Sequence, residues 1–414
     1  MRIGIIGGGI SGLVAAYLLH ADHEITLFEA ADYIGGHTHT VDVTVEGDQQ
    51  AVDTGFIVYN DWTYPNFIKL LDRLGVATQP TSMGFSVRCD RSGIEYSGNT
   101  LSSLFAQRSN LFRWRFYCMV ADILRFNRQA ERVLQSDSAD TTVGDYLQAE
   151  RYSVEFREQY FLPMASAIWS CPPGDLLGFP MRFIVEFYRN HGLLRVINRP
   201  TWRVIQGGSR NYVGPLARGF QDRIRVSTPI QQIARSENSV TVTTAAGTSE
   251  EFDEAILGCH SDQALQMLAD PSSVETELLL AFRYQPNAVV LHTDPAVLPR
   301  RRAAWASWNY HLLPGETSAA TVTYNMNILQ RLTSQHVFNV TLNETSHIDP
   351  SRILQTFEYA HPVFTTAKRA AQARHAEVIR QRRTSFCGAY WGSGFHEDGV
   401  NSALAVCRAF GKEL

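Results

Sequence analysis

The 414-residue chain lacks an excess of positive charge, paired cysteines and long apolar runs. Its net charge of −4 argues against a nucleic-acid binder, because such proteins usually carry a basic excess. Its six cysteines stand singly, which argues against zinc and disulfide frameworks and suits reduced thiols in a cytosol. No run of 18 or more uncharged apolar residues could span a bilayer, and no histidine and carboxylate cluster has metal-ligand spacing. We therefore expect a cytoplasmic protein without a metal site or a nucleic-acid partner.

The opening segment combines a strand, a glycine turn, a helix and a second strand. The pattern predicts a strand at residues 2–6, a helix at 11–19 and a strand at 24–28 that ends at Glu29. The turn holds Gly7, Gly9 and Gly12, a spacing that allows a tight turn, close approach of a pyrophosphate and close helix packing. The first N–H groups of the helix would face the phosphates, and Glu29 would bind ribose hydroxyls. This segment predicts a dinucleotide site.

The segments after Glu29 differ from a nicotinamide-binding domain, which would continue directly into further βα units. A second glycine pair, Gly35-Gly36, follows six residues later and could pass along the same cofactor. Strand patterns at residues 224–258 look like the completion of the first fold. The chain is therefore expected to leave the cofactor domain and return to it.

Residues 103–134 have helical spacing, with Phe112 and Phe116 among the apolar positions. Five arginines are interleaved with them: Arg108, Arg113, Arg115, Arg125 and Arg128. One interpretation is a core-facing helix with a solvated basic face. The other is peripheral contact with anionic lipid headgroups at the inner face of the membrane.

Three strand-like stretches, at residues 282–287, 305–311 and 321–327, alternate aromatic with amide or hydroxyl side chains. They suit a sheet that lines a pocket, in which Trp308 and Tyr310 would face the substrate. An ordinary aromatic-rich sheet is the alternative. Because the inferred pocket has few charges, a hydrophobic small molecule fits it better than a polyamine or a charged amino acid.

Taken in order along the chain, these features resemble the flavin-containing amine oxidase superfamily, which includes phytoene desaturases, protoporphyrinogen oxidases and polyunsaturated fatty acid isomerases. The matching pieces are the first glycine turn, Glu29, Gly35-Gly36, Gln206-Gly207-Gly208, Thr228-Pro229-Ile230 and Cys387-Gly388-Ala389. The chain looks closest to a bacterial branch described as NAD/FAD-binding oxidoreductases, on the blocks Val52 to Asn60, Ala304 to Tyr310 and Phe395 to Gly399.

The resemblance implies an α/β fold in which a Rossmann-like FAD-binding domain is interleaved with an α+β substrate domain that contains a mixed sheet. The FAD-binding domain would comprise residues 1–80, 201–265 and 376–414. The substrate domain would comprise residues 81–200 and 266–375, with the helical segment 103–134.

The implied cofactor is FAD, bound in an extended form. Gly399 and Val400 would begin a helix whose N–H groups face the flavin. The residues expected to bind FAD are Gly7, Gly9, Ile10, Ser11, Gly12, Glu29, Ala30, Gly36, His37, Thr38, Thr54, Gly55, Phe56, Ile230, Gly388, Ala389, Asp398, Gly399 and Val400.

Two positions depart from the superfamily's pattern. The paired glycines are commonly followed by arginine, whereas this chain has His37, which reduces the positive charge near the flavin unless the imidazole is protonated. Many amine oxidases also use a lysine that reaches the flavin through water, and none of Lys69, Lys368 and Lys412 stands on a matching strand. The second departure argues against amine oxidation.

The candidates for catalysis are His396, Glu397, Tyr310 and Tyr59. For the cluster His396-Glu397-Asp398, capping of the last helix is the competing interpretation. We expect dehydrogenation of a C–C or C–N bond in a hydrophobic, lipid-like (fatty acyl) substrate, by hydride transfer to the flavin. An isomerase of unsaturated fatty acids, an amine oxidase and a non-catalytic flavin-bearing partner protein are the alternatives.

Overall fold

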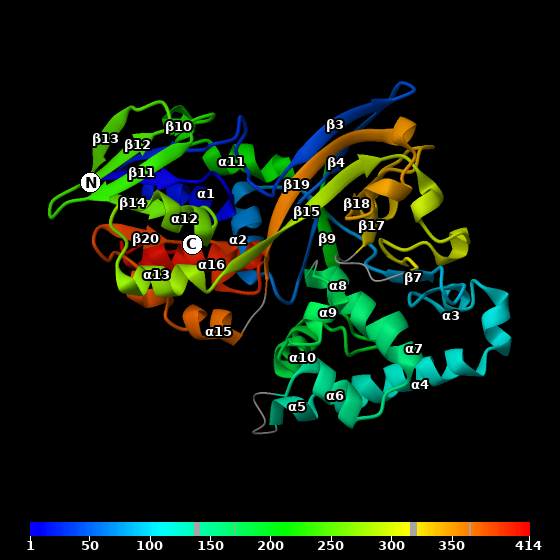
Figure 1. The fold of residues 1–414 in the computed structure, drawn as a ribbon. Coiled ribbons are helices and arrows are strands. Elements are labelled where there is room, and N and C mark those ends of the chain that lie inside the picture. The colour runs from blue at the N-terminus through cyan, green and yellow to red at the C-terminus, as the bar shows by residue number, and fades with distance from the viewer. Residues whose placement is uncertain (136–140, 170, 315–320, 364–365) are drawn as a thin grey trace.

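The computed structural model describes residues 1–135, 141–169, 171–314, 321–363 and 366–414. The molecule has two lobes with a helical unit beneath them (Figure 1). The first lobe contains both chain ends. The second lobe contains the long strands β15 (Arg283–His292) and β19 (Ile353–Val363), which run back toward the first.

The first lobe is built on a five-stranded parallel sheet with the order β10-β2-β1-β14-β20. Its strands are β1 (Arg2–Ile6), β2 (Glu24–Phe28), β10 (Ile224–Arg225), β14 (Glu254–Leu257) and β20 (Thr384–Phe386). β1 lies between β2 and β14, a strand about 250 residues later. The predicted return of the chain to the cofactor fold is thereby confirmed.

Helices and a second sheet cover the two faces of the parallel sheet. One face packs on α1 (Ile10–Leu19), α11 (Val213–Ala217) and α16 (His396–Arg408), with α2 (Pro65–Leu74) in the same core. The other face packs on the antiparallel strands β11 (Ile230–Arg235), β12 (Val240–Thr244) and β13 (Ser249–Phe252) and on α12 (Ser261–Met267) and α13 (Ser273–Leu280). The strands of the parallel sheet are therefore buried on both sides, as this sheet type requires.

The second lobe contains a seven-stranded mixed sheet with the order β19-β15-β18-β17-β16-β7-β8. β7 (Phe85–Cys89) and β16 (Trp308–Leu312) pair in parallel, and the other neighbours are antiparallel. The remaining members are β8 (Ile94–Ser97), β17 (Val322–Asn325) and β18 (Asn339–Leu342). The predicted α/β fold with an α+β second unit and a mixed sheet is thus confirmed, whereas the residue boundaries of the two domains stay a prediction.

Short strands join the two lobes. β3 (Thr40–Val45) and β4 (Asp48–Asp53) form a hairpin, and β9 (Trp202–Ile205) lies between β5 (Val58–Asn60) and β6 (Thr78–Pro80). Asp53 fixes this junction, because its buried carboxylate accepts hydrogen bonds from the Thr40 hydroxyl (2.5 Å) and the Ser209 N–H (2.8 Å). Burial raises its pKa to about 6.

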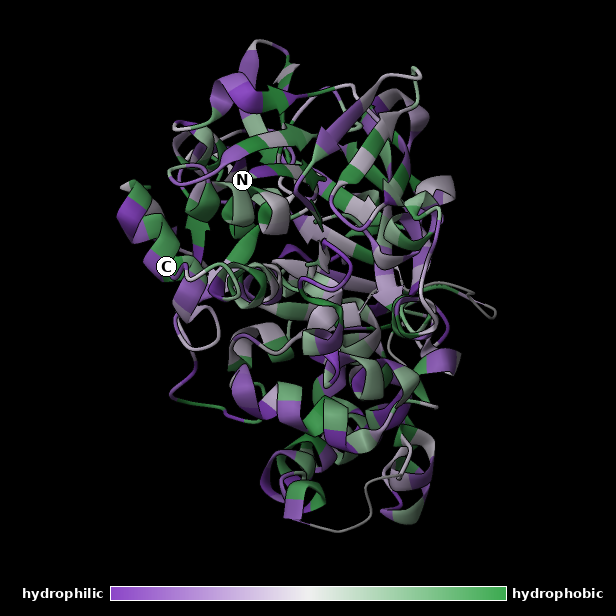
Figure 2. Cartoon of the chain, turned by 90° about the vertical axis from the view of Figure 1, so that its left-hand side faces the viewer, coloured by the Kyte–Doolittle hydropathy of each residue, from purple (hydrophilic) through white to green (hydrophobic). Residues whose placement is uncertain are grey.

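The helical unit contains α3 to α10 and an aromatic core. Its helices are α3 (Leu101–Leu104), α4 (Trp114–Gln129), α5 (Arg132–Gln135), α6 (Val143–Ala149), α7 (Val154–Phe156), α8 (Leu162–Trp169), α9 (Pro173–Leu176) and α10 (Met181–Asn190). Purple and green segments alternate along these helices in the lower part of Figure 2, as amphipathic helices require. α4, with 16 residues, is the longest described helix, and none in the described part of the chain is both long and apolar enough to cross a membrane.

The segment 103–134 is helical as predicted, but it is not one helix with one apolar face. The backbone at Arg113 is extended (φ −99°, ψ 98°), so the 3₁₀ turn Arg108–Phe112 and α4 have separate registers. Phe116 is fully buried, whereas Phe112 is 89% exposed. Grouping Phe112 with the core-facing positions was therefore wrong, because the periodicity does not continue across the extended residue.

Candidate functional site

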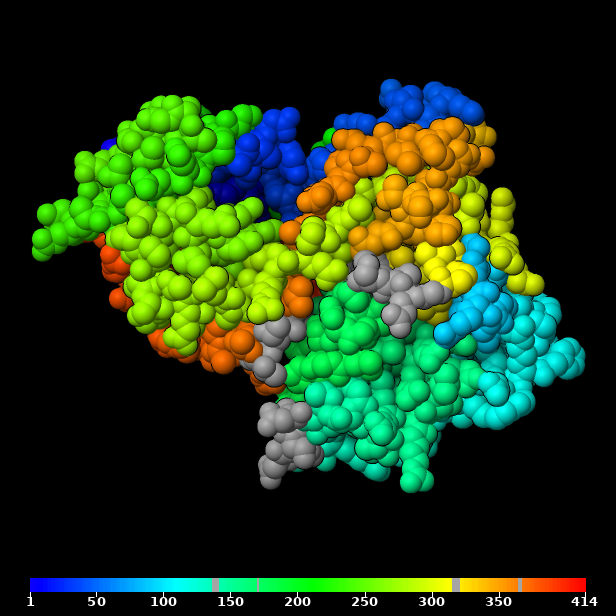
Figure 3. All heavy atoms as spheres, in the orientation of Figure 1, coloured from blue at the N-terminus to red at the C-terminus, as the bar shows by residue number. Residues whose placement is uncertain are grey.

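A large cavity lies at the carboxyl edge of the parallel sheet, between the two lobes. Gly7, Glu29, Gly258 and Gly388 follow the ends of four strands of the sheet, and all four line the cavity, whose volume is about 920 Å³. Figure 3 shows the recess between the lobes, with N-terminal residues in blue at its bottom. Open α/β sheets bind ligands at this edge, and the volume is near the upper end of the roughly 300–1,000 Å³ typical of ligand pockets.

The first glycine turn has the geometry of a phosphate cradle. Gly7 has a φ of +101°, which disfavours any side chain, and a Cβ on Gly12 would overlap the Gly7 carbonyl oxygen. A Cβ on Gly9 would have only Gly36 Cα nearby, at 4.0 Å. The start of α1 therefore opens onto the cavity with first-turn N–H groups that have no partner within the helix.

Glu29 is oriented by the backbone around it. Its carboxylate accepts hydrogen bonds from the N–H groups of Gly8 (2.6 Å) and Ala31 (2.8 Å), and it lines the cavity. Because two N–H groups fix the carboxylate, its remaining lone pairs have a defined direction for a hydroxyl ligand. Ile230 of β11, Thr228 and Gln263 of α12 also line the cavity.

The second glycine pair crosses the first turn. Gly35 and Gly36 both have positive φ values (133° and 59°), and a Cβ on Gly36 would be 3.0 Å from Gly9 Cα. This crossing carries His37 to the cavity wall, whereas Thr38 lies behind the wall. The Thr38 hydroxyl is 2.6 Å from the Tyr212 hydroxyl oxygen.

His396 is the residue of the C-terminal cluster that reaches the cavity. Its ring stacks on Phe56, with centroids 3.5 Å apart and planes 11° apart. Its Nε2 is 2.9 Å from the Thr38 hydroxyl and 3.1 Å from the Tyr212 hydroxyl. Burial lowers the pKa of His396 well below its usual value, so the imidazole is neutral at physiological pH. A neutral ring with this fixed orientation can position a ligand but carries no charge.

Glu397 and Asp398 do not line the cavity, and their carboxylates cap the starts of two helices. The Glu397 carboxylate accepts hydrogen bonds from the N–H groups of Asn66 (3.0 Å) and Phe67 (2.8 Å), at the start of α2. Asp398 accepts from the Phe395 N–H (2.9 Å), at the start of its own helix. For these two carboxylates, the structure favours capping over contact with a ligand.

The last helix begins earlier than predicted. α16 starts at His396, so the expectation that Gly399 and Val400 begin the helix was wrong, because Phe395 and Asp398 form the cap three residues upstream. Gly399 instead packs on α1: its carbonyl accepts a hydrogen bond from the Ser11 hydroxyl (2.9 Å). A Cβ there would be 2.7 Å from Ile10 Cγ2. Gly399 therefore supports the phosphate cradle from behind and does not line the cavity.

The part of the cavity formed by the second lobe and by α8 of the helical unit is apolar and aromatic. It is lined by Ile168, Trp169, Val289, Trp308, Tyr324, Leu329 and Leu342. Tyr310 and Tyr59 are not among the lining residues, because both are buried in hydrophobic cores. The strands 305–311 and 321–327 thus do line a pocket, through Trp308 and Tyr324.

Most of the predicted FAD residues meet at this one cavity. Those that line it are Gly7, Gly9, Ile10, Ser11, Glu29, Ala30, Gly36, His37, Thr54, Gly55, Phe56, Ile230, Gly388 and Ala389, together with the candidate His396. Gly12, Thr38, Asp398, Gly399 and Val400 stand behind the wall. Their assignment to FAD binding stays a prediction.

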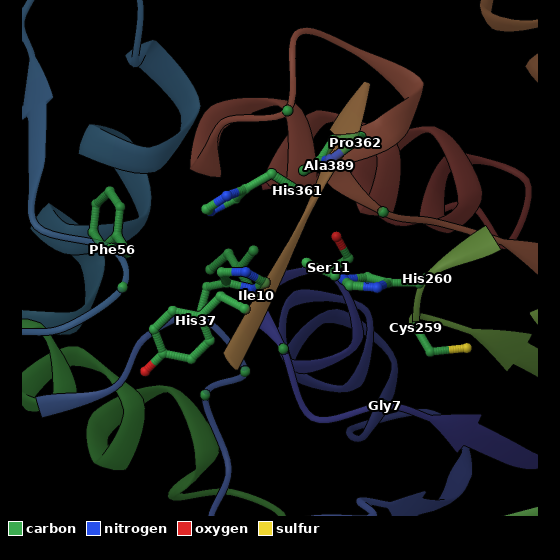
Figure 4. A pocket seen from close by; sticks show the side chains of 18 of the residues that line it. Gly7, Ile10, Ser11, His37, Phe56, Cys259, His260, His361, Pro362 and Ala389 are labelled. Atoms are coloured by element: carbon green, nitrogen blue, oxygen red, sulfur yellow. The ribbon is translucent and has the colours of Figure 1, made fainter. Parts of the chain in front are cut away.

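Several lining residues escaped the sequence reasoning. His260, Tyr284, Tyr359 and His361 all reach the cavity, and Figure 4 shows His260 and His361 near the start of α1. For His260, the place three residues after β14, at the carboxyl edge of the sheet, was a usable signal. The position of His361 depends on the pairing of β15 with β19, which no local sequence pattern predicts.

Comparison with known proteins decides the family. Residues 10–409 match the family described as flavin containing amine oxidoreductase. The chain belongs to this family. A protein of Mycobacterium tuberculosis, AofH, provisionally named as a flavin-containing monoamine oxidase, is 25% identical over 264 residues, which are 59% of this chain and 54% of AofH. The chain thus spans about half the length of that curated relative.

Solved structures share the fold over nearly the whole chain. The cyclohexylamine oxidase of Brevibacterium oxydans matches with a TM-score of 0.68 at 15% identity, covering 99% of both chains. A fatty acid isomerase from P. acnes matches with a TM-score of 0.68 at 15% identity, covering 99% of this chain and 98% of the isomerase. At these identities the likeness concerns the fold alone.

The residues of the cavity fit the family's cofactor, FAD. Three glycines leave the start of α1 open to a pyrophosphate, Glu29 presents an oriented carboxylate, and His37 Nε2 is a buried polar atom without a hydrogen-bond partner among the described residues. These residues would hold the flavin of this oxidoreductase family, and a bound flavin would supply an acceptor for a hydride. The protein's own part is to bind, to orient and to exclude water.

Proposed function

We propose that this flavoenzyme dehydrogenates a C–C or C–N bond in a hydrophobic, lipid-like substrate such as a fatty acyl chain. The observation that carries the proposal is the apolar wall of the cavity in the second lobe. Among the described lining residues the carboxylates are Glu29, which two backbone N–H groups already engage, and Glu358, which is exposed. Such a wall favours an uncharged chain over a cationic amine.

Trp308 is the residue suited to orient this substrate. Its ring meets Tyr324 edge to face, with centroids 5.1 Å apart. Its indole Nε1 is buried and has no hydrogen-bond partner in the described part of the chain. A carbonyl or hydroxyl oxygen of the substrate would satisfy this N–H, while the apolar wall holds the hydrocarbon.

Amine oxidation is the alternative supported by the family and by the relative AofH. The described lining contains no lysine: Lys69 donates to the Leu414 carbonyl, and Lys412 pairs with Asp22, both on the surface of the first lobe. The water-mediated lysine that many amine oxidases use therefore has no counterpart among these cavity residues. Isomerisation of an unsaturated fatty acid is the second alternative, because it needs the same apolar wall but returns the hydride to the substrate.

Anaerobic reduction of the bound flavin separates these functions. The loaded protein is mixed with unsaturated and saturated acyl lipids, a carotenoid and a panel of primary amines, and the flavin absorbance is followed. Bleaching by an acyl lipid supports the proposal, and double-bond migration without net bleaching indicates the isomerase. Bleaching by amines alone would contradict it, and a flavin that no compound reduces would indicate a non-catalytic partner protein. Trp308→Phe serves as the matched variant.

We also propose that the protein meets anionic lipid surfaces through α3, the 3₁₀ turn and α4. Six exposed apolar side chains lie in this segment: Leu101 (79% exposed), Leu111, Phe112 (89%), Trp114 (69%), Tyr117 and Leu124. Arg108 and Arg115 are exposed among them, so the apolar side chains are flanked by positive charge. Aromatic and basic residues in this combination suit an interface with anionic headgroups. This surface would supply a lipid-like substrate.

A further inference from the structure

Three histidines from distant segments meet at the start of α1. His37 follows the second glycine pair, His260 follows β14, and His361 lies near the end of β19. All three line the cavity, and Figure 4 shows their rings around the start of α1. The ring centroid of His37 is 5.6 Å from that of His361 and 6.1 Å from that of His260.

When protonated, these three rings can give the cavity a positive charge. The described lining residues include no arginine and no lysine, and the remaining lining histidine, His396, is engaged by Thr38 and Tyr212. The diphosphate of FAD carries two negative charges, and the α1 dipole alone is worth only about half an elementary charge. A buried anion of this size requires further compensation.

Two of the rings have polar atoms arranged for a ligand. His37 Nε2 is buried and lacks a hydrogen-bond partner among the described residues. The Asn287 amide donates to His361 Nδ1 (3.0 Å), so the neutral ring carries its proton on Nε2. The described residues contain no group of three or more His, Cys, Asp or Glu arranged to hold a metal ion. An anion is therefore the ligand that suits these histidines.

We propose that His37, His260 and His361 form a histidine clamp that closes on the diphosphate of FAD and takes up protons as the cofactor binds. The inference rests on the family's cofactor and not on the identity of the substrate. In this proposal, three titratable side chains neutralise the diphosphate, a role that a permanently charged arginine after the glycine pair would otherwise have.

The electrostatics of the site without ligand support this assignment. Burial and the neighbouring imidazoles hold the pKa of His37 at about 3 and that of His361 at about 4, and burial lowers the pKa of His260. All three are therefore neutral near pH 7 before FAD binds. A negative charge at hydrogen-bonding distance raises the pKa of an imidazole. The three histidines therefore take up protons when the diphosphate binds.

Other titratable groups face the clamp and modulate it. Asp262 raises the pKa of His260, whereas Tyr284, stacked on His260 with centroids 4.3 Å apart, is un-ionised because burial raises its pKa. The remaining neighbours are Tyr359, His396, Cys259, Glu29 and Glu358. None of these groups supplies a positive charge at neutral pH, so proton uptake is assigned to the clamp.

The test is the FAD affinity of the apoprotein as a function of pH, measured by quenching of flavin fluorescence. Each proton taken up tightens binding about tenfold per pH unit as the pH falls from about 8 to about 5.5. Calorimetry in two buffers with unequal ionisation enthalpies counts the same protons without any variant. An affinity that does not change with pH, with heats that do not depend on the buffer, would overturn the proposal.

Variants assign the protons to the clamp. His37→Gln, His361→Gln and His37→Arg each reduce the pH slope. His37→Arg also tightens FAD binding at pH 8 about tenfold or more, because guanidinium stays charged. His375→Gln is the matched control: His375 is also neutral, with a pKa of about 4, but bonds the Phe386 carbonyl outside the cavity. An unchanged slope in His37→Gln and His361→Gln together would refute the clamp.

Discussion

Replacing Gly399 by valine tests the packing that holds the phosphate cradle in place. Gly399 lies in the first turn of α16, against the start of α1. An ideal Cβ at this position would be 2.7 Å from Ile10 Cγ2 and 3.1 Å from the Ser11 hydroxyl oxygen. Carbon atoms pack at about 3.5–4.0 Å, so Ile10 must retreat by roughly 1 Å. Ile10 and Ser11 begin the helix whose N–H groups face the cavity.

The expected cost follows from this clash. Overfilling a packed core typically destabilises the folded protein by about 1–3 kcal/mol. The better helix propensity of valine offsets only a few tenths of a kcal/mol of this loss. If the strain is relieved by displacing the start of α1, the same free energy is lost from FAD binding. It corresponds to a roughly 5- to 150-fold weaker affinity. We therefore expect the variant to be purified with little flavin.

The assay compares the flavin-to-protein absorbance ratio of the purified variant with its FAD dissociation constant. Far-ultraviolet circular dichroism establishes that the variant is folded. Gly214→Ala in α11 is the control, because a Cβ at Gly214 has no atom within 4 Å and alanine favours a helix. A folded Gly399→Val protein with full flavin and unchanged affinity would refute the packing argument.

Three further changes have defined outcomes. Glu397→Gln removes one acceptor from the start of α2 and should lower the free energy of unfolding by about 1–3 kcal/mol, measured by urea denaturation, without altering the spectrum of bound flavin. Trp308→Phe removes the unpaired indole N–H and should raise KM for the substrate more than it lowers kcat; an unchanged KM would remove Trp308 from substrate binding. The double variant Phe112→Ser and Trp114→Ser should lose sedimentation with anionic vesicles while keeping FAD affinity, whereas equal sedimentation of both proteins would contradict a lipid-facing surface.

The cofactor half of the site could be predicted because its signals are local. The glycines at 7, 9 and 12 lie within six residues, and their spacing reports a backbone geometry that the structure shows directly in the positive φ of Gly7. Glu29 follows from the length of one helix and one strand. The parallel sheet then brings the ends of its strands to a single edge, whatever their distance in the sequence.

The remaining features depend on contacts between distant residues. Glu397 bonds N–H groups about 330 residues away, so its capping role could not be separated from catalysis by the sequence. His361 joins His37 only because β19 pairs with β15 along its whole length. Phe112 has the helical spacing in the sequence, but its side chain is exposed, because the extended backbone at Arg113 interrupts the helical register.

Under the proposed function, the FAD of this protein takes hydrogen from a hydrophobic chain held by the apolar wall around Trp308. Anaerobic mixing of the loaded protein with an unsaturated acyl lipid and, separately, with a primary amine of similar length tests it most directly. The account predicts loss of the flavin absorbance with the lipid and a spectrum that does not change with the amine. Bleaching by the amine, with no change on adding any lipid, would contradict it.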